Sequence, residues 1–396
     1  MLKLIKLYSY KTNSDLPYPR YRFRSKNLLI YLRNTHFMIL MFLFVSPVFQ
    51  KCQYQQAESS SIIGVKIYEP QENYEQLFQE WRDMGINTAF VSVALAYDES
   101  FRSQALKDQV KVLIILPVFF NLDALKEHPE WYAITQHGTP AKEEWVEFIS
   151  PSNEAYRAQR IAFIQRVVQE TKPDGISLDF IRYFAYWEKI HDGRTLASLP
   201  NTSFDAASLA AFQREKEIKI PLELQTTASR AAWILANHSE SWTQWKCSQI
   251  VSIVEDIVYT TKAIQPGLLV NLHAVPWREN DFEGAIKKIV GQDFKRLAKM
   301  TDFISPMCYS HMLKQDANWV SSVVKDIQRQ TGEVDLLPSI QVKEAYLERE
   351  LSEEEFEENL KAALKPPSKG VVFWSWAHLE QDPGKKSIIS KWVKKQ

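Results

Sequence analysis

The sequence predicts a (β/α)8 barrel, and three observations support that prediction. Short runs rich in β-branched residues alternate along the chain with segments of helical periodicity, an order typical of a parallel sheet. Eight such runs occur, which is the number of strands that a closed barrel requires. The chain has 396 residues, of which 45% are hydrophobic, and this is enough for one barrel with insertions.

The expected strands are short and apolar, and each is followed by a stretch with helical spacing or by a long connection. Between them, residues 74–84 form an amphipathic segment ended by Gly85, and residues 153–170 repeat apolar side chains at helical spacing. We expect these segments to form the outer ring of helices. The expected strands are residues 62–68, 88–94, 110–116, 175–180, 268–273, 303–308, 336–340 and 370–374.

Two connections are much longer than the usual few residues. One spans residues 117–152 after the third strand, and the other runs from residue 184 to about 266 after the fourth, with at least two helices at 204–219 and 242–264. Loops that follow barrel strands form the active-site face, so both insertions are expected to shape the substrate cleft. The acidic run 348–358 is expected to be the solvated face of a helix.

The N-terminal 60 residues differ from the rest of the chain. Residues 37–49 carry no charge, Arg33 precedes them and Lys51 follows. That stretch has the length of the apolar region of a secretory signal and is short for a membrane span of roughly 20 residues. We therefore expect residues 1–60 to be an export segment and spacer, residues 61–396 to be the barrel, and the protein to be periplasmic, at the cell surface or secreted. Membrane anchoring through this segment and a lipid on Cys52 are the alternatives.

Charge and cysteine content narrow the classes of partner. Residues 1–51 contain nine Lys or Arg against the single Asp15, which leaves 39 basic and 47 acidic residues in the remainder. An acidic body argues against nucleic acid as a partner. Cys52, Cys247 and Cys308 are too few and too scattered for a disulfide framework or a zinc site. No metal ion or organic cofactor is expected.

The most informative local pattern is DGISLDFIRY at residues 174–183. Because side chains alternate along a strand, Ser177 and Asp179 share the side that faces the barrel interior, with Asp179 at the strand's C-terminal end. Catalytic groups of barrel enzymes lie at such ends, and a carboxylate there is costly unless it is paired or used. The alternative is a buried Asp that caps a loop or pairs with Arg182. We expect Arg182 to hold Asp179 ionised.

This pattern resembles the fourth-strand motif of a bacterial glycoside-hydrolase-like (β/α)8-barrel family, in which Asp-Gly-Ile and two variable residues precede Asp-Tyr-Ile-Arg-Tyr or Asp-Phe-Ile-Arg-Phe. Three further stretches are similar to elements of that family, in matching order between about residues 62 and 376. The resemblance implies a barrel hydrolase that acts on glycans. Ile181 and Arg182 stand where chitinase-like barrels have a Glu, which argues against a substrate-assisted mechanism. The further stretches are HPEW (128–131) with Phe148 and PSNEAYR (151–157), Gly291–Gln292–Asp293, and ISPMCYSH (304–311).

Glycoside hydrolysis ordinarily needs a second carboxyl group as acid or base. We prefer Glu279, since the fifth strand neighbours the fourth and residues 273–281 are rich in types that bind sugars. Each candidate also has a simpler interpretation as a solvated loop acid, or as a helix N-cap for Asp281. The candidates that follow strand ends are Glu69, Asp98, Glu279, Asp281, Glu344 and Glu380.

Several other side chains are expected to bind the sugar. Aromatic rings at strand ends stack on the apolar faces of pyranose rings, and a histidine inside the upper barrel donates to a sugar hydroxyl. Packing in the core is the alternative for each. The expected substrate-binding residues are Arg182, Tyr183, His273, Trp277, Tyr309, His311, Trp374 and Trp376.

Taken together, these patterns predict a hydrolase of an extracellular polysaccharide or cell-wall glycan that uses Asp179 and a second carboxylate. One alternative is a barrel that binds glycans without cleaving them. Another is a metal-dependent hydrolase, which normally carries His-x-His on the first strand, where this chain has residues 64–68, GVKIY. Sugar identity, stereochemical outcome and oligomeric state stay open.

Overall fold

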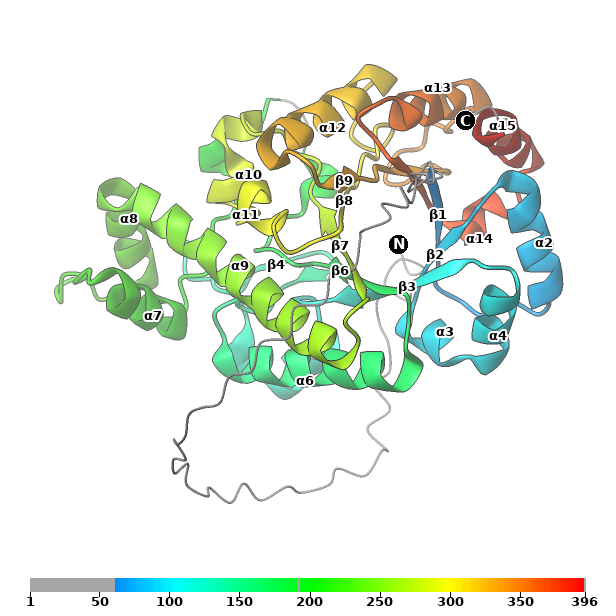
Figure 1. The fold of residues 1–396 in the computed structure, drawn as a ribbon. Coiled ribbons are helices and arrows are strands. Elements are labelled where there is room, and N and C mark those ends of the chain that lie inside the picture. Colours follow the sequence, from blue (N-terminus) through cyan, green and yellow to red (C-terminus); the bar gives the residue numbers. More distant parts are fainter. Residues whose placement is uncertain (1–60, 191–192, 395–396) are drawn as a thin grey trace, which may run out of the picture. The chain divides into compact units, whose positions relative to one another are not determined.

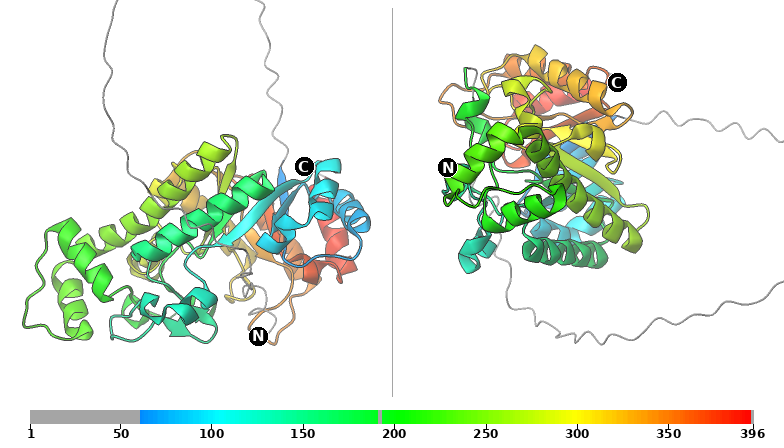
Figure 2. Two further views of the ribbon diagram at one scale, coloured as in Figure 1. Left: turned by 90° about the horizontal axis from the view of Figure 1, so that it is seen from below. Right: turned by 90° about the vertical axis from the view of Figure 1, so that its left-hand side faces the viewer.

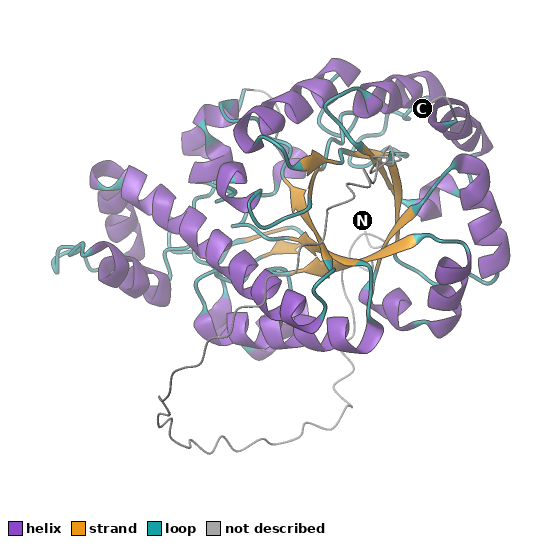
Figure 3. Ribbon diagram, viewed as in Figure 1, coloured by secondary structure: helices purple, strands orange, loops and turns teal. Residues whose placement is uncertain are grey.

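The computed structural model describes residues 61–190 and 193–394, and these residues form the expected (β/α)8 barrel. The strands form a ring, and the helices surround it (Figure 1, Figure 3). All pairings in the barrel sheet are parallel. In sheet order the strands are β10 (Ser339–Gln341), β11 (Gly370–Trp374), β1 (Ile62–Ile67), β2 (Thr88–Val91), β3 (Lys111–Pro117), β6 (Gly175–Asp179), β7 (Leu269–Ala274), β8 (Phe303–Pro306) and β9 (Asp335–Leu336).

The helices lie outside the strands, and their apolar sides pack onto the sheet. Asn73 caps the first of them through a hydrogen bond to the Gln76 amide, and Gly85, at a φ of 75°, ends it. The helices are α2 (Tyr74–Met84), α3 (Val93–Tyr97), α4 (Glu99–Lys107), α5 (Leu122–Glu127), α6 (Glu154–Thr171), α7 (Ala206–Lys216), α8 (Thr227–Asn237), α9 (Ser239–Ile264), α10 (Ala285–Lys288), α11 (Phe294–Leu297), α12 (Ala317–Thr331), α13 (Glu353–Leu364), α14 (Trp376–Leu379) and α15 (Pro383–Val393).

The seventh predicted strand, residues 336–340, is divided into β9 and β10. Pro338 lies between them and has no N–H to donate to a ladder. The segment still joins both edges of the sheet, since the Leu337 amide donates to Ile304 O and the Val372 amide donates to Pro338 O, each at 3.0 Å. These bonds close the barrel.

The first two residues of the DGISLDFIRY pattern, Asp174 and Gly175, have structural roles at the beginning of β6. The Asp174 carboxylate accepts a hydrogen bond from the Val112 amide at 2.8 Å, which ties β3 to β6 at the lower end of the barrel. Gly175 leaves room for its neighbour strand, because a Cβ there would lie 2.7 Å from Leu269 O. Asp174 and Gly175 therefore stabilise the contacts between neighbouring strands at the start of β6, whereas Asp179 lies at its end.

Two insertions enlarge the C-terminal side of the barrel, as expected. After β3, residues 142–147 form the antiparallel pair β4 (Lys142–Glu143) and β5 (Val146–Glu147). After β6, helices α7 and α8 extend to one side with the first part of α9 (Figure 1, Figure 2). These helices bury an apolar cluster of their own that includes Phe212, Trp242 and Trp245. The insertion thus contributes a second core beside that of the barrel.

Several predicted bounds differ from the structure; the sixth strand, for example, ends at Pro306 rather than residue 308. Residues 348–352 are not helical, because α13 begins after Ser352, whose side chain accepts from the Glu355 amide. The second strand ends at Val91 rather than residue 94, because Ser92 caps α3 by accepting from the Leu95 amide. The export segment lies outside the described residues. Within residues 61–190 and 193–394, none of the helices has the length and hydropathy needed to cross a membrane.

Candidate functional site

Asp179 lies at the end of β6 inside the barrel, where strand alternation predicted it. Its side chain is 95% buried and approaches two neighbours. Oδ1 accepts a hydrogen bond from the Phe180 amide at 2.8 Å, and Oδ2 lies 3.3 Å from Nδ1 of His273 at the end of β7. The structure therefore brings Asp179 and His273 together, two of the residues selected from the sequence.

A chain of buried hydrogen bonds sets the orientation of His273. Ser305 Oγ donates to Asn271 Oδ1 at 2.8 Å, and Asn271 Nδ2 donates to Ser177 Oγ at 2.8 Å. Ser177 Oγ lies 3.2 Å from His273 Nε2, and its hydroxyl hydrogen can donate to that nitrogen. When Ser177 donates to Nε2, a neutral His273 carries its proton on Nδ1, the nitrogen that lies 3.3 Å from Asp179 Oδ2. Three polar residues of β6, β7 and β8 thus hold the Nε2 side of the ring, and a Ser177 donor favours the tautomer with its proton on Nδ1.

Lys66 of β1 is a cation whose charge acts on both members of this pair, and it was not among the residues selected from the sequence. It is buried, and its Nζ donates to the Tyr309 hydroxyl at 3.1 Å. Burial opposes ionisation of Asp179, but contacts with His273, the charge of Lys66 and the Phe180 amide outweigh it and lower the pKa of Asp179 to about 2. Burial lowers the pKa of His273 and brings that of Lys66 to about 8. At neutral pH the site therefore holds an ionised carboxylate beside a neutral imidazole.

Arg182 does not take the role expected for it beside Asp179. Its guanidinium donates to the carbonyls of Tyr183 and Ala185 and lies over the Phe148 ring, 4.7 Å from its centre. Phe180 adopts a φ of 48°, which ends the extended strand and redirects the residues after it. The expectation that Arg182 keeps Asp179 ionised was wrong, because Lys66 and His273 supply those interactions. Arg182 nevertheless lines the same cavity as Asp179.

Glu188 is a second carboxyl group at this cavity. It lies in a single 3-10 turn, Trp187–Lys189, and lines the cavity together with Asp179. The residue is partly accessible, but its Oε2 is fully enclosed and has no hydrogen-bond partner among the described residues. Burial, reinforced by the charge of Asp179 and opposed by that of Arg182, raises the pKa of Glu188 to about 7. One cavity thus holds two carboxyl groups whose pKa values are shifted in opposite directions.

Aromatic rings form most of the remaining walls. Tyr309 and Trp374, both selected from the sequence, stack with ring centres 4.4 Å apart, and both line the cavity. Trp145, from the β4–β5 turn, donates from Nε1 to the hydroxyl of Tyr346 at 2.9 Å. Loops after β3, β6, β8 and β10 therefore meet around Asp179. The full lining is Trp145, Asp179, Phe180, Arg182, Trp187, Glu188, Met307, Tyr309, Tyr346 and Trp374.

Glu279, the preferred second carboxylate, does not lie at this cavity. Its side chain is 43% exposed and forms ion pairs with Arg329 at 3.3 Å and Lys287 at 4.0 Å, while its amide donates to Asp326 of α12. These contacts direct Glu279 toward the outer helices. None of the other candidate carboxylates lines the cavity either. Asp98, for example, caps α4 and accepts from the Tyr74 hydroxyl at 2.6 Å.

Four of the residues selected for sugar binding pack elsewhere. Tyr183 is buried with Lys246 Nζ 4.5 Å from its ring centre, and Trp277 packs against Phe282. Trp376 is buried against Trp81 of α2, with ring centres 5.8 Å apart. These three aromatic residues lie in the core. The fourth is His311, which is also buried. Its Nε2 donates to Arg349 O at 2.8 Å, in the segment before α13. Its Nδ1 lies 2.9 Å from both Glu355 Oε1 and Arg349 Nη2.

The sequence contained partial signals for the residues that were missed. Lys66 is a charged residue within an apolar strand and shares the inward-facing parity of Gly64, so alternation alone could have selected it. Glu188 follows the aromatic run FAYW at residues 184–187, but nothing in that run specifies which way its side chain points. In the described part of the chain, no group of three or more His, Cys, Asp or Glu side chains is arranged to hold a metal ion.

Comparisons with known proteins identify the fold. No family model and no curated protein matches the sequence. Among solved structures, the glycoside hydrolase domain of PgaB (BpsB) from Bordetella bronchiseptica is similar with a TM-score of 0.62 at 13% identity, over 83% of this chain and 98% of that domain. A β-galactosidase from Marinomonas ef1 is similar with a TM-score of 0.61 at 12% identity, over 84% of this chain and 59% of that protein, so the chain spans about three-fifths of its length. The barrel of this chain is therefore of the kind found in glycoside hydrolases.

Proposed function

We propose that this protein hydrolyses glycosidic bonds in an extracellular polysaccharide or cell-wall glycan, with Asp179 and Glu188 as its two carboxyl groups. The observation that supports the proposal most directly is the pair of opposite pKa shifts, to about 2 for Asp179 and about 7 for Glu188, in one aromatic cavity. Two carboxyl groups whose pKa values are moved apart by their surroundings are typical of a general acid and its ionised partner. Similarity of the barrel to those of glycoside hydrolases agrees with this assignment.

The two groups have distinct roles in this proposal. Protonated Glu188 donates its proton to the glycosidic oxygen as the bond to the anomeric carbon breaks. Ionised Asp179 either attacks that carbon or stabilises the positive charge that develops on the sugar ring. Water supplies the hydroxyl group that ends on the anomeric carbon, and its remaining proton restores Glu188. Stacked Tyr309 and Trp374 form an apolar wall of the cavity beside Asp179.

His273 and Lys66 support Asp179 in this scheme. Nδ1 of His273 lies 3.3 Å from Asp179 Oδ2, so the imidazole lies directly beside the carboxylate. Lys66 keeps the carboxylate ionised after it has been removed from water. An extracellular location for the substrate rests on the apolar segment at residues 37–49, and it remains a prediction from the sequence.

The assay for this function measures the release of reducing ends from a broad panel of plant, fungal and bacterial polysaccharides. We expect the wild-type protein to release reducing ends from at least one of them and Asp179→Asn protein to release almost none. Binding to the same polysaccharides is measured in parallel. A protein that binds a glycan but releases no reducing ends from any member of the panel is a glycan-binding barrel, and the hydrolase proposal is then wrong.

A further inference from the structure

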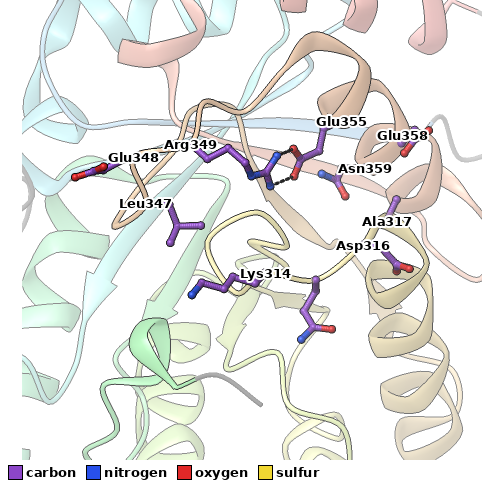
Figure 4. Close-up of a pocket in the computed structure, with 10 residues that line it drawn as sticks. Lys314, Asp316, Ala317, Leu347, Glu348, Arg349, Glu355, Glu358 and Asn359 are labelled. Carbon is purple, nitrogen blue, oxygen red and sulfur yellow. Dashed lines mark hydrogen bonds and ion pairs between the residues drawn. The ribbon is translucent and has the colours of Figure 1, made fainter. Parts of the chain in front are cut away.

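A larger pocket of about 580 Å³, shown in Figure 4, is lined by two of the loops that also line the candidate active site. Its walls come from the loop after β8, the loop after β10 and the first turns of α13. The volume is within the range of roughly 300–1,000 Å³ that small-molecule sites occupy. Both donors and acceptors line it, and the charged and amide side chains among them are Lys314, Gln315, Asp316, Glu348, Arg349, Glu355, Glu358 and Asn359.

The pocket and the Asp179 cavity share two loops. After β8, Met307 and Tyr309 line the cavity, and Lys314 lines the pocket a few residues later. After β10, Tyr346 lines the cavity, and the next residue, Leu347, lines the pocket. On this loop, neighbouring residues in the sequence therefore line the two hollows.

One wall of the pocket is held firmly in place. Arg349 donates to both carboxylate oxygens of Glu355, at 2.6 and 3.1 Å, as the dashed lines in Figure 4 show. His311, buried behind this pair, donates to Arg349 O and so fixes the backbone of the loop after β10. Bidentate pairs of this kind restrict the positions of both side chains. The wall is therefore in position before a ligand arrives.

Asn359 supplies the observation that indicates a ligand. It is 97% buried and lines the pocket, yet its Oδ1 has no hydrogen-bond partner among the described residues. Figure 4 shows its amide beside Glu355, on the side of α13 that faces Lys314 and Asp316. A buried polar atom without a partner is costly, and a ligand hydroxyl would satisfy it.

We propose that this pocket binds sugar units of the substrate beyond the bond that is cleaved, so that the substrate is an oligosaccharide or polysaccharide that spans both hollows. The proposal rests on the proposed function and extends it to the length and charge of the substrate. Four acidic side chains and two basic ones line the pocket, and Arg349 is already paired. An excess of carboxylates repels uronic acids, so the bound sugars carry no negative charge.

The test compares variants of α13 that differ in whether the altered side chain lines the pocket. Asn359→Leu removes the unpartnered amide at nearly constant volume, and Glu358→Gln removes one lining charge. Glu354→Gln is the matched control, since Glu354 is an exposed acid of the same helix that does not line the pocket. The probes are cello-, xylo-, manno- and chito-oligosaccharides from dimer to hexamer. Affinity is measured by calorimetry on Asp179→Asn protein, and kcat/KM is measured on active protein.

We expect hexamers to bind more tightly than dimers, and Asn359→Leu to reduce hexamer affinity and kcat/KM by roughly three- to tenfold, the effect of one hydrogen bond, while dimer values stay unchanged. Glu358→Gln should act in the same direction, and Glu354→Gln should change neither. Equal hexamer values for all variants, or an absence of binding across the probes, would overturn the proposal. If hexamers bind in this length-dependent way but no glycan is cleaved, the pocket proposal stands and the hydrolase proposal fails.

Discussion

Polar residues at the ends of neighbouring strands behave differently in two regions of this barrel. Within β6 and β7, Asp179, His273 and their hydrogen-bond partners point inward and meet. Beyond the last paired residues of β7 and β8, Glu279 and His311 turn outward and bond to α12 and to the segment around α13. Both regions offered candidate residues from the sequence, but only those of the first lie beside Asp179. A position within a strand fixes the direction of its side chain, whereas a position just past the strand does not.

The largest effect is expected from Asp179→Asn, which removes the ionised group of the inward-facing region. Turnover should fall by about a hundredfold or more, because electrostatic stabilisation of the transition state is lost. Folding should survive, since Lys66, with a pKa already lowered to about 8, can lose its proton when its partner is gone. Turnover and thermal midpoint are measured on one preparation. A destabilised variant that retains full activity per folded molecule would assign Asp179 a structural role instead.

The pair Glu188→Gln and Glu279→Gln compares the two regions directly. Loss of a general acid typically costs about a hundredfold or more in rate, so Glu188→Gln should be strongly impaired, and Glu279→Gln should be close to wild type. Because Glu188 must be protonated, wild-type kcat/KM should decline as pH rises through about 7. That decline should be missing from the residual activity of Glu188→Gln. A larger loss in Glu279→Gln than in Glu188→Gln would reverse the assignment.

Lys66→Met and Arg182→Ala distinguish the roles of the two cations, because each variant should shift a different limb of the pH profile. Lys66 lowers the pKa of Asp179, so its removal should shift the acidic limb of kcat/KM upward. Arg182 lowers the pKa of Glu188, so its removal should shift the basic limb upward. Complete pH profiles of both variants provide the test. An acidic limb that moves in Arg182→Ala and stays in place in Lys66→Met contradicts this division.

Ser177→Ala tests the hydrogen-bond chain behind His273. Without the Ser177 hydroxyl, Nε2 of His273 has no donor, and the imidazole no longer has a single preferred tautomer. We expect a reduction in kcat of roughly tenfold or less, since one hydrogen bond is removed at one step from the carboxylate. Nitrogen NMR of the His273 ring reports the tautomer independently of activity. A ring that keeps its proton on Nδ1 in the variant would show that the chain does not control it.

The smallest effect on catalysis is expected from His311→Leu in the outward-facing region. Loss of its contacts with Arg349 and Glu355 should reduce the free energy of unfolding by about 1–3 kcal/mol. Hydrolysis of short substrates per folded molecule should not change, because His311 does not line the Asp179 cavity. Denaturant unfolding and dimer hydrolysis check both parts. Loss of activity without loss of stability would show that His311 has a role in the active site.

The sequence predicted the barrel well because strand and helix periodicities are local. All eight predicted strands correspond to strands of the structure, and Asp179, His273, Tyr309 and Trp374 meet at one rim. Glu188 was missed because its position depends on how the loop after β6 folds against the β4–β5 turn, for example through Tyr186 and Glu144, whose side chains bond at 2.8 Å. Such contacts between distant loops leave no periodic pattern. Glu279 was preferred only because its strand neighbours β6, and neighbouring strands do not ensure converging loops.

The residues at the two ends of β6 have different roles, and this difference affects how related chains can be recognised. Asp174 and Gly175 join strands at the lower end of the barrel, whereas Asp179 faces the cavity at the other end. A descendant that had lost its chemistry would still need the first two residues in order to fold. Searches that score the ten-residue pattern as a unit will therefore group active and inactive proteins together. Sorting such a group requires separate scoring of the carboxylate at position 179 and the lysine at position 66.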